Sequence, residues 1–182
     1  MRAEGATIVI GDIDPETGKT VADDLNATFV QVDVSDQVAV DRLFDTAAET
    51  HGSVDIAFNN AGISPPEDDL IENTGIDAWQ RVQDINLKSV FFCCKAALRH
   101  MVPNQKGSII NTASFVAVMG SATSQISYTA SKGGGACDVA RTRRAVRAAG
   151  GSGSTRCAPG RSTHRCCRSC SPRTPPSGPP AG

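Results

Sequence analysis

Short runs rich in β-branched residues alternate with helix-length segments along the first two thirds of the chain, and this alternation constrains the fold most strongly. Four such runs occur before residue 113: Thr7–Ile10, Thr28–Val32, Val54–Phe58 and Ser108–Thr112. Each has the length and apolar character of a buried parallel strand. Strands that alternate with helices predict an α/β fold, with a parallel sheet covered on both faces.

The segments between these runs carry helix signals. Asp14 is expected to cap a helix that has Pro15 in its first position and ends near Leu25. Ser35 is expected to cap a second helix, which ends near Gly52. A single long helix is expected from about Asp77 to Met101.

Polar residues follow each predicted strand: Asp12, Asp33, Asn60 and Ser114. Ligands of open parallel sheets bind at the carboxyl ends of the strands. The sequence therefore predicts a site at this edge of the sheet.

A tyrosine and a lysine lie four residues apart in Tyr128-Thr129-Ala130-Ser131-Lys132, so they share one face of a helix. A phenol beside a fixed ammonium is easier to deprotonate, because the opposite charge favours the phenolate. The pair predicts a proton shuttle, with Ser114 upstream to hydrogen-bond the reacting oxygen.

This arrangement, together with Asn59-Asn60-Ala61-Gly62, resembles the short-chain dehydrogenase/reductase family over roughly residues 2–134. The resemblance implies an incomplete Rossmann-like, doubly wound parallel sheet. It implies that Tyr128 is the general acid/base and that Lys132 lowers its pKa and holds the nicotinamide ribose. Ser114 would position the substrate carbonyl. Asn86 would hold a water molecule in the proton relay.

The resemblance also implies a nicotinamide cofactor. A carboxylate at Asp12 would bind the adenosine ribose and repel a 2′-phosphate, which favours NAD over NADP. Asp14 is the alternative for this role, and Asp12 is otherwise only the start of a turn. Asn59-Asn60 is alternatively a plain turn. The residues expected to bind the cofactor are Asp12, Ile13, Asp33, Val34, Asn60, Ala61, Gly62, Tyr128 and Lys132.

The start of the chain departs from the family pattern. The sequence has no Gly-rich T-G-x-x-x-G-x-G turn, which brings backbone amides to the cofactor pyrophosphate. Residues 1–6 instead resemble the end of the helix that follows such a turn. About 30 residues, the first half of a βαβ unit, are expected to be missing. The sheet would then lack a central strand, and an inactive remnant is the first alternative function.

The C-terminal segment departs as well. From Gly133 onward the chain has no Leu, Ile, Phe, Met, Trp, Tyr or Lys. Such a segment buries too little apolar surface to offset its ordering entropy. We therefore expect a catalytic domain over residues 1–134 and a disordered tail over residues 135–182. Residues 1–132 have a net charge of −9 and residues 133–182 one of +8.

A reading-frame shift explains the composition of the tail. When the third base of each codon is read with the first two of the next, Cys166-Cys167 gives leucine unambiguously. With permissible GC-rich codons, Gly153 through Pro175 then give a peptide that contains the family's N-x-x-x-P-G segment. We hypothesise a one-base slip between Gly133 and Ala136.

The composition of the tail suggests two other functions, metal binding and nucleic-acid binding. The cysteines around His164 are crowded, unlike the spaced pairs of a structural zinc site, so no metal site is predicted. Nine arginines favour nucleic-acid binding electrostatically, but no aromatic residues are interleaved for base stacking. A basic interaction protein is therefore the second alternative, and a nucleic-acid partner is not expected.

The remaining expectations concern substrate, assembly and location. The family reaction is reversible hydride transfer between a secondary alcohol or ketone, including 3-oxoacyl thioesters, and nicotinamide. The resemblance alone implies a homo-oligomer, built with the helix around Ser89–Leu98 and the helix that carries Tyr128. No run approaches the ~20 apolar residues of a membrane span, and no signal peptide is visible, so a cytoplasmic location is expected.

Overall fold

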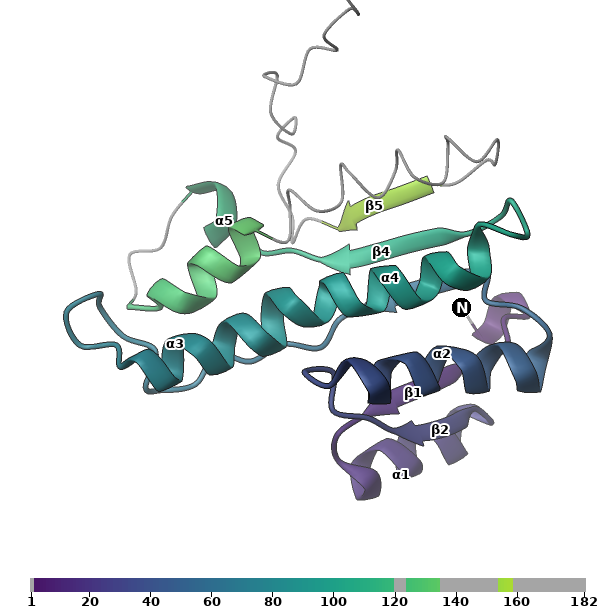
Figure 1. Cartoon of the computed structure of the whole chain (residues 1–182). Coiled ribbons are helices and arrows are strands. Elements are labelled where there is room, and N and C mark those ends of the chain that lie inside the picture. Colours follow the sequence, from purple (N-terminus) through teal and green to yellow (C-terminus); the bar gives the residue numbers. More distant parts are fainter. Residues whose placement is uncertain (1, 120–123, 135–153, 159–182) are drawn as a thin grey trace, which may run out of the picture.

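The computed structural model describes residues 2–119, 124–134 and 154–158, whose strands form two separate sheets (Figure 1). In the first, β1 (Val9–Asp12) pairs in parallel with β2 (Thr28–Gln31). In the second, β4 (Ser108–Thr112) pairs in parallel with β3 (Ile56–Asn59) on one side and β5 (Ser154–Ala158) on the other. The α/β fold with an incomplete parallel sheet is therefore confirmed.

Helices connect these strands in chain order. A short 3-10 turn, η1 (Arg2–Glu4), precedes β1. The others are α1 (Pro15–Leu25), α2 (Gln37–His51), α3 (Ile76–Gln83), the π-helical turn η2 (Asp84–Lys88), α4 (Ser89–Met101), α5 (Val116–Met119) and a helix over residues 126–134.

Helix α1 begins as the sequence predicts and packs on the two-stranded sheet. The carboxylate of Asp14 accepts the backbone N–H groups of Glu16 and Thr17, and Pro15 occupies the first helical position. Gly18 faces the ring of Phe29, and a Cβ built there would lie only 2.3 Å from Cε2 of that ring. The missing side chain of Gly18 therefore lets α1 approach β2 closely.

The predicted start of α2 is wrong by one residue. Asp36, not Ser35, caps the helix, and its carboxylate accepts the N–H of Val38. Ser35 is engaged elsewhere, because its N–H and its hydroxyl both donate to Oδ1 of Asp33, at 2.8 and 2.7 Å. Because Asp33 binds Ser35 in this turn, the helix is capped one residue later, by Asp36.

One hydrophobic core joins the two sheets. Helix α2 packs against α4, and α4 packs against β3 and β4 (Figure 1). Apolar side chains from α2, β3, α4 and β4, together with Val32 directly after β2, form one buried cluster, which includes Phe44, Ala57, Met101 and Ile109. Arg99 of α4 also pairs with Asp41 and Asp45 of α2. Side-chain packing between α2 and α4 therefore connects two parts that share no strand ladder in the described residues.

Residues 154–158, which lie within the predicted tail, form a strand. They pair with β4 in the register Ser108 to Ser154 through Thr112 to Ala158. Strand ladders use backbone groups that every residue except proline supplies, so an apolar composition is not required. The rest of the predicted tail, the proposed frame shift and the arginine- and cysteine-rich segment lie outside the described residues.

Candidate active site

The carboxyl ends of β3 and β4 lie side by side and start the candidate site. Asn60 directly follows β3, and Thr112 is the last residue of β4. The hydroxyl of Thr112 donates to the side-chain oxygen of Asn60 at 2.9 Å. This bond holds the side chain of Asn60 at the edge of the sheet where parallel sheets bind ligands.

The long helix expected from Asp77 to Met101 is interrupted by the π-helical turn η2, and Asn86 lies inside that turn. Asn86 is buried, and its side chain forms three hydrogen bonds. Its Oδ1 accepts the N–H of Ile63 at 2.7 Å, and its Nδ2 donates to Ile63 O at 2.8 Å and to Ser131 Oγ at 3.2 Å. Single π turns in helices often mark functional sites.

Tyr128 and Lys132 lie on the helix over residues 126–134, one turn apart. Lys132 is buried, with 7% of its surface exposed, and its Nζ donates to Thr112 O at 3.3 Å. The same nitrogen lies 5.7 Å from the centre of the Tyr128 ring. Burial lowers the pKa of Lys132, because removal from water disfavours the ammonium. The Tyr128–Lys132 pair is thus present as predicted, with the lysine anchored to the end of β4.

Gly62 completes this group because it leaves room for two of the side chains. A Cβ built on Gly62 would lie 3.2 Å from Oδ1 of Asn86 and 3.3 Å from Nζ of Lys132. The structure therefore brings together five predicted site residues, called here the Tyr128 cluster: Asn60, Gly62, Asn86, Tyr128 and Lys132. Ala61 lies between two of them in the chain.

Ser114 lies at the same edge but is not joined to the phenol. It follows the end of β4 by two residues, and its carbonyl accepts the N–H of Ala117 at the start of α5. Within the described ranges no hydrogen bond links Ser114 to Tyr128. Its predicted role in holding the reacting oxygen stays a prediction.

The four residues expected at the adenosine end lie at or just after the carboxyl ends of the strands of the other sheet. Asp12 is the last residue of β1, and its Oδ1 accepts the N–H of Asp14 at 3.0 Å. Ile13 is 63% exposed, and Val34 packs against the core. In the part of the chain that the structure describes, no hydrogen bond or ion pair joins Asp12, Ile13, Asp33 or Val34 to the Tyr128 cluster.

Three residues of this region were missed from the sequence. Ser131 Oγ donates to Tyr128 O at 2.8 Å and links Asn86 to the helix over residues 126–134. Thr112 contacts both Asn60 and Lys132. Asp68, in the loop after β3, accepts the N–H groups of Ser127 and Tyr128. Ser131 lies three residues after Tyr128, and this helical spacing indicates from the sequence alone that the two residues are neighbours. Nothing in the sequence distinguishes Asp68 from its acidic neighbours.

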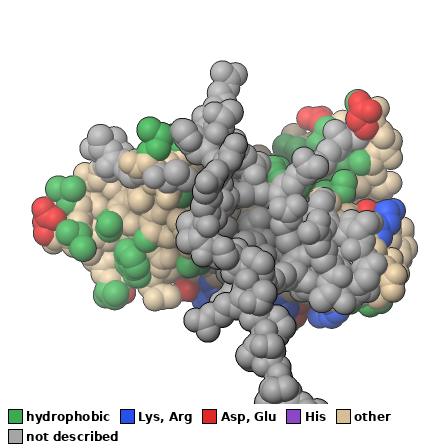
Figure 2. Space-filling model, turned by 90° about the horizontal axis from the view of Figure 1, so that it is seen from above, with side chains coloured by type: hydrophobic (Ala, Val, Ile, Leu, Met, Phe, Trp, Pro, Cys, Tyr) green, Lys and Arg blue, Asp and Glu red, His purple; other side chains and the backbone are tan. Residues whose placement is uncertain are grey.

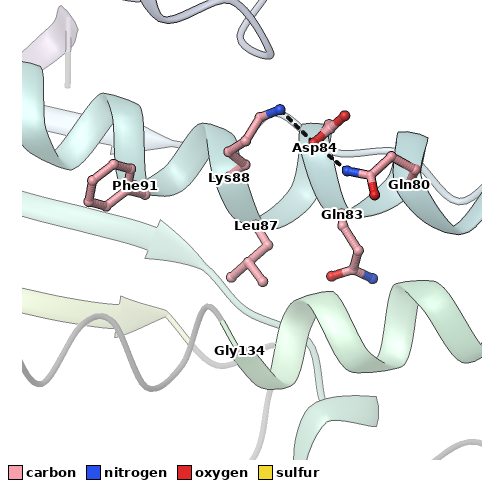
Figure 3. A pocket seen from close by; sticks show the side chains of 7 residues that line it. All are labelled: Gln80, Gln83, Asp84, Leu87, Lys88, Phe91 and Gly134. Atoms are coloured by element: carbon pink, nitrogen blue, oxygen red, sulfur yellow. Dashed lines mark hydrogen bonds and ion pairs between the residues drawn. The ribbon is translucent and has the colours of Figure 1, made fainter.

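A pocket of about 470 Å³ lies elsewhere, between the row formed by α3, η2 and α4 and the helix over residues 126–134 (Figure 3). Its lining residues are Gln80, Gln83, Asp84, Leu87, Lys88, Phe91 and Gly134. None of them belongs to the Tyr128 cluster. In Figure 3 the Leu87 side chain points toward the helix that ends at Gly134, while Lys88 points away and pairs with Asp84.

Apolar side chains are exposed at the end of the molecule that carries α3 and α5. They belong to the loop before α3, to the start of α3 and to the segment around α5: Leu70, Ile71, Ile76, Phe115 and Met119. Figure 2 shows hydrophobic side chains on the surface at this end of the molecule. The arrows of β4 and β5 point toward α5 in Figure 1, so this surface adjoins the carboxyl ends of the strands.

Neither α4 nor any other described helix has the length and apolar character to cross a membrane. The described ranges also contain no group of three or more His, Cys, Asp or Glu side chains arranged to hold a metal ion.

Comparison with known proteins identifies the family. A family model described as enoyl-(acyl carrier protein) reductase matches residues 1–144. The chain is 42% identical over 149 residues to the mitochondrial borneol dehydrogenase of Lavandula x intermedia, which covers 82% of this chain and 56% of that protein. It is 38% identical over 135 residues to the 3-oxoacyl-acyl-carrier-protein reductase FabG of Chlamydia pneumoniae, covering 71% and 53%.

A third relative, the cis-4-hydroxycyclohexanecarboxylate dehydrogenase of Sinomonas cyclohexanicum, is 40% identical over 165 residues, covering 88% of this chain and 65% of that protein. The chain therefore belongs to the short-chain dehydrogenase/reductase family. It spans about half the length of the curated relatives it matches. The family match extends ten residues past the predicted boundary at residue 134, and the division into a domain and a tail stays a prediction.

Proposed function

We propose that this chain provides the catalytic core of an oxidoreductase that interconverts a secondary alcohol and a ketone by hydride transfer with NAD. The Tyr128 cluster carries the proposal, because a phenol, a buried lysine and a buried asparagine meet at the carboxyl ends of β3 and β4. Family membership supports the same reaction class.

Each polar residue of the cluster has a distinct part in the proposed reaction. In the oxidation direction, the Tyr128 phenolate accepts the proton of the alcohol hydroxyl, and a ketone forms as the carbon–hydrogen bond breaks. When bound, the nicotinamide supplies the hydride acceptor at C4. Lys132 Nζ lies 5.7 Å from the ring centre, which places this side chain next to the phenol. Ser114 holds the alcohol oxygen, and Asn86 keeps the Ile63 backbone and Ser131 in place.

The residues present fit a nicotinamide cofactor at two points. At the nicotinamide end, Gly62 leaves open the space that a Cβ would take beside Asn86 and Lys132. At the adenosine end, an exposed carboxylate at Asp12 would bind the ribose hydroxyls and repel a 2′-phosphate. Asp14 is a weaker choice, because its carboxylate already accepts two backbone N–H groups and the Thr17 hydroxyl at 2.6 Å. We therefore propose NAD over NADP.

An apolar substrate is favoured by the surface beside the cluster. Leu70, Ile71, Phe115 and Met119 are all exposed at the end of the sheet where the substrate would enter. Relatives are named for acting on borneol and on a 3-oxoacyl carrier-protein thioester, and both carry apolar carbon frameworks. We propose a cyclic or long-chain alcohol or ketone as the first class to test, with 3-oxoacyl thioesters as the second.

Equilibrium binding and turnover test this function together. Purified protein is titrated with NADH by fluorescence. It is assayed for oxidation of borneol and a hydroxycyclohexanecarboxylate with NAD⁺, and for reduction of a 3-oxoacyl thioester with NADH. We expect NADH binding in the wild type and in Tyr128→Phe, with turnover lost by about 10²–10⁴-fold in the variant. Unchanged turnover in Tyr128→Phe, at an unchanged melting temperature, would remove Tyr128 from the mechanism.

The alternative of an inactive remnant has its own support. The described strands form two sheets without a shared ladder, so the residues expected at the two ends of the cofactor are not joined by one sheet. No binding at millimolar NADH by a folded wild-type chain would favour the remnant over the enzyme.

Assembly and location complete the proposal. We propose that the face around Phe91, which is 55% exposed beside the pocket of Figure 3, contacts a second copy of the chain. Light scattering of the wild type and of Phe91→Glu tests this, with a lower mass expected for the variant. The cytoplasmic location stays a prediction, to be checked by microscopy of a tagged chain.

A further inference from the structure

The first turn of the helix that carries Tyr128 is held by a carboxylate from a distant part of the chain. Asp68 lies in the loop after β3 and is buried, with only 3% of its surface exposed. Its Oδ1 accepts the N–H of Ser127 at 2.8 Å, and its Oδ2 accepts the N–H of Tyr128 at 2.8 Å. Both oxygens of one buried carboxylate therefore bind adjacent backbone groups of the proposed catalytic helix.

These backbone groups lack partners within their own helix. The first four N–H groups of any helix have no intrahelical acceptor and must find another. In this helix, Thr129 N donates to Gln125 O, and Ile126 N donates to Asp69 O at 3.2 Å. Together with the two bonds to Asp68, the loop satisfies three of the four groups.

Local sequence does not supply this cap. Gln125 precedes the helix, and glutamine is not among the residues favoured at that position, which are Ser, Thr, Asp and Asn. A negative charge at a helix N-terminus is also favourable, because the helix dipole places positive charge there. Asp68 is 60 residues away in the chain, yet it accepts the N–H groups that the side chain of an N-cap residue normally accepts.

A second contact ties the same turn to α3. Nε2 of Gln83 donates to Ser127 O at 2.9 Å. Ser124, just before the helix, binds the carboxylate of Asp69, and this bond lowers the pKa of Asp69. The first turn is thus held on its N–H side by the loop and on its carbonyl side by Gln83, while Lys132 is anchored one turn further on.

We propose that Asp68 is a positioning residue, which fixes Tyr128 relative to Lys132 and Asn60 by holding the first turn of the helix. This inference rests on the proposed function for its catalytic consequence. The anchoring itself is independent of turnover. Loss of the carboxylate frees the N–H of Tyr128 itself, so the turn frays at the residue whose phenol must stay aligned. Lys132, bound to the end of β4, stays in place.

Amide exchange tests the anchoring without any need for activity. In the wild type, we expect the amides of Ser127 and Tyr128 to be protected, although first-turn amides of a helix normally exchange fast. In Asp68→Asn, we expect both to exchange about tenfold faster or more, since hydrogen bonds to charged groups contribute about 1.5–3 kcal/mol. Amides of α4 should not change. Unprotected Ser127 and Tyr128 amides in the wild type overturn the proposal, even if every variant fails to fold.

The single tyrosine of the chain gives a second readout. With 3-fluorotyrosine incorporated, the protein has one ¹⁹F resonance, which comes from position 128. We expect Asp68→Asn to shift or broaden it and Glu67→Gln to leave it unchanged. Glu67 is the matched control because it is an exposed carboxylate one residue away. Equal effects of the two variants on the resonance and on exchange overturn the proposal.

Turnover then connects the anchor to the reaction. We expect Asp68→Asn to lower kcat about tenfold or more and to leave the NADH dissociation constant within about twofold. If the wild type binds NADH but shows no turnover, the proposed function fails, and the exchange and ¹⁹F results still decide the role of Asp68. An unchanged kcat in a variant with fast amide exchange overturns the positioning role.

Discussion

The side-chain amide of Asn59 donates a 2.7 Å hydrogen bond to the side-chain oxygen of Asn111, its direct partner in the register of β3 and β4. Asn111 is buried at 3% exposure, and both amides also approach Cys94 Sγ of α4, at 3.7 and 3.8 Å. A polar bridge therefore lies just before the carboxyl ends from which Asn60 and Thr112 extend. It joins two residues that are already partners in the ladder and so adds a side-chain bond to the pairing of β3 with β4.

Removal of this bridge should destabilise the fold. We expect Asn111→Ala to lower the free energy of unfolding by about 1–3 kcal/mol, because the half-buried amide of Asn59 loses its acceptor. Urea denaturation measures the change. Asn104→Ala is the control, since Asn104 is exposed and bonds only to His100 O of its own helix end. Equal losses in the two variants would show that the bridge contributes nothing special.

One methyl group should have opposite effects at two glycines. Gly62→Ala places a Cβ 3.2 Å from Asn86 Oδ1 and 3.3 Å from Lys132 Nζ, so both side chains must shift. We expect weaker NADH binding and a lower melting temperature. At Gly133 nothing lies within 4 Å of the new atom, and the residue is helical. Gly133→Ala should therefore stabilise the chain by up to about 1 kcal/mol. Thermal melts of both variants check the signs.

The buried lysine should make stability depend on pH. Burial lowers the pKa of Lys132 from 10.5, so at pH values between the lowered and the ordinary pKa the unfolded chain binds more protons than the folded one. The contribution of Lys132 to stability therefore rises with pH in that window, and below it the cost of burying the ammonium is fully present. Lys132→Met removes this cost.

We expect Lys132→Met to gain most stability over the wild type near neutral pH and to lose that advantage as pH approaches about 10.5. Urea midpoints across this range measure the difference. The exposed Lys19→Met serves as the comparison. A pH-independent difference for Lys132→Met would contradict the assignment.

Cys93 should resist alkylation in the folded protein. Burial raises the pKa of this thiol to about 12, with a smaller contribution from the neighbouring Cys94, so little reactive thiolate forms at mildly alkaline pH. We expect the peptide that contains Cys93 and Cys94 to remain unlabelled by iodoacetamide until urea unfolds the chain. Mass spectrometry of the digested protein measures labelling. Fast modification without denaturant would place these side chains outside the core.

The DNA sequence tests whether a frame shift produced the unusual composition of the C-terminal segment. We expect a one-base correction between the codons of Gly133 and Ala136 to convert residues 153–175 into the apolar, N-x-x-x-P-G-containing peptide. Resequencing of the gene through its stop codon measures this. If the codons present cannot encode that peptide in the shifted frame, the frame-shift hypothesis is wrong.

Sequence patterns predicted the strands and the Tyr128–Lys132 pair because both depend on local spacing. The same patterns missed contacts between distant segments. Asn86 was expected in an unbroken helix, but its bonds to Ile63 and Ser131 accompany a π turn that hydrophobic periodicity does not reveal. Asp68 was indistinguishable from the acidic residues beside it until the fold placed it against the catalytic helix. Ser35 failed as a cap because Asp33 already bound its hydroxyl.

The break between β1–β2 and β3–β4 has a consequence for how the molecule opens. Backbone ladders transmit strain stiffly, whereas the two sheets are joined by side-chain packing in one core, with α2 against α4, and by the Arg99 ion pairs. The molecule should therefore unfold in two steps, with amides of β1 and β2 exchanging together while those of β3 and β4 stay closed. The part of the proposed site that binds adenosine would then open first. A bound dinucleotide that contacts both parts would oppose this opening.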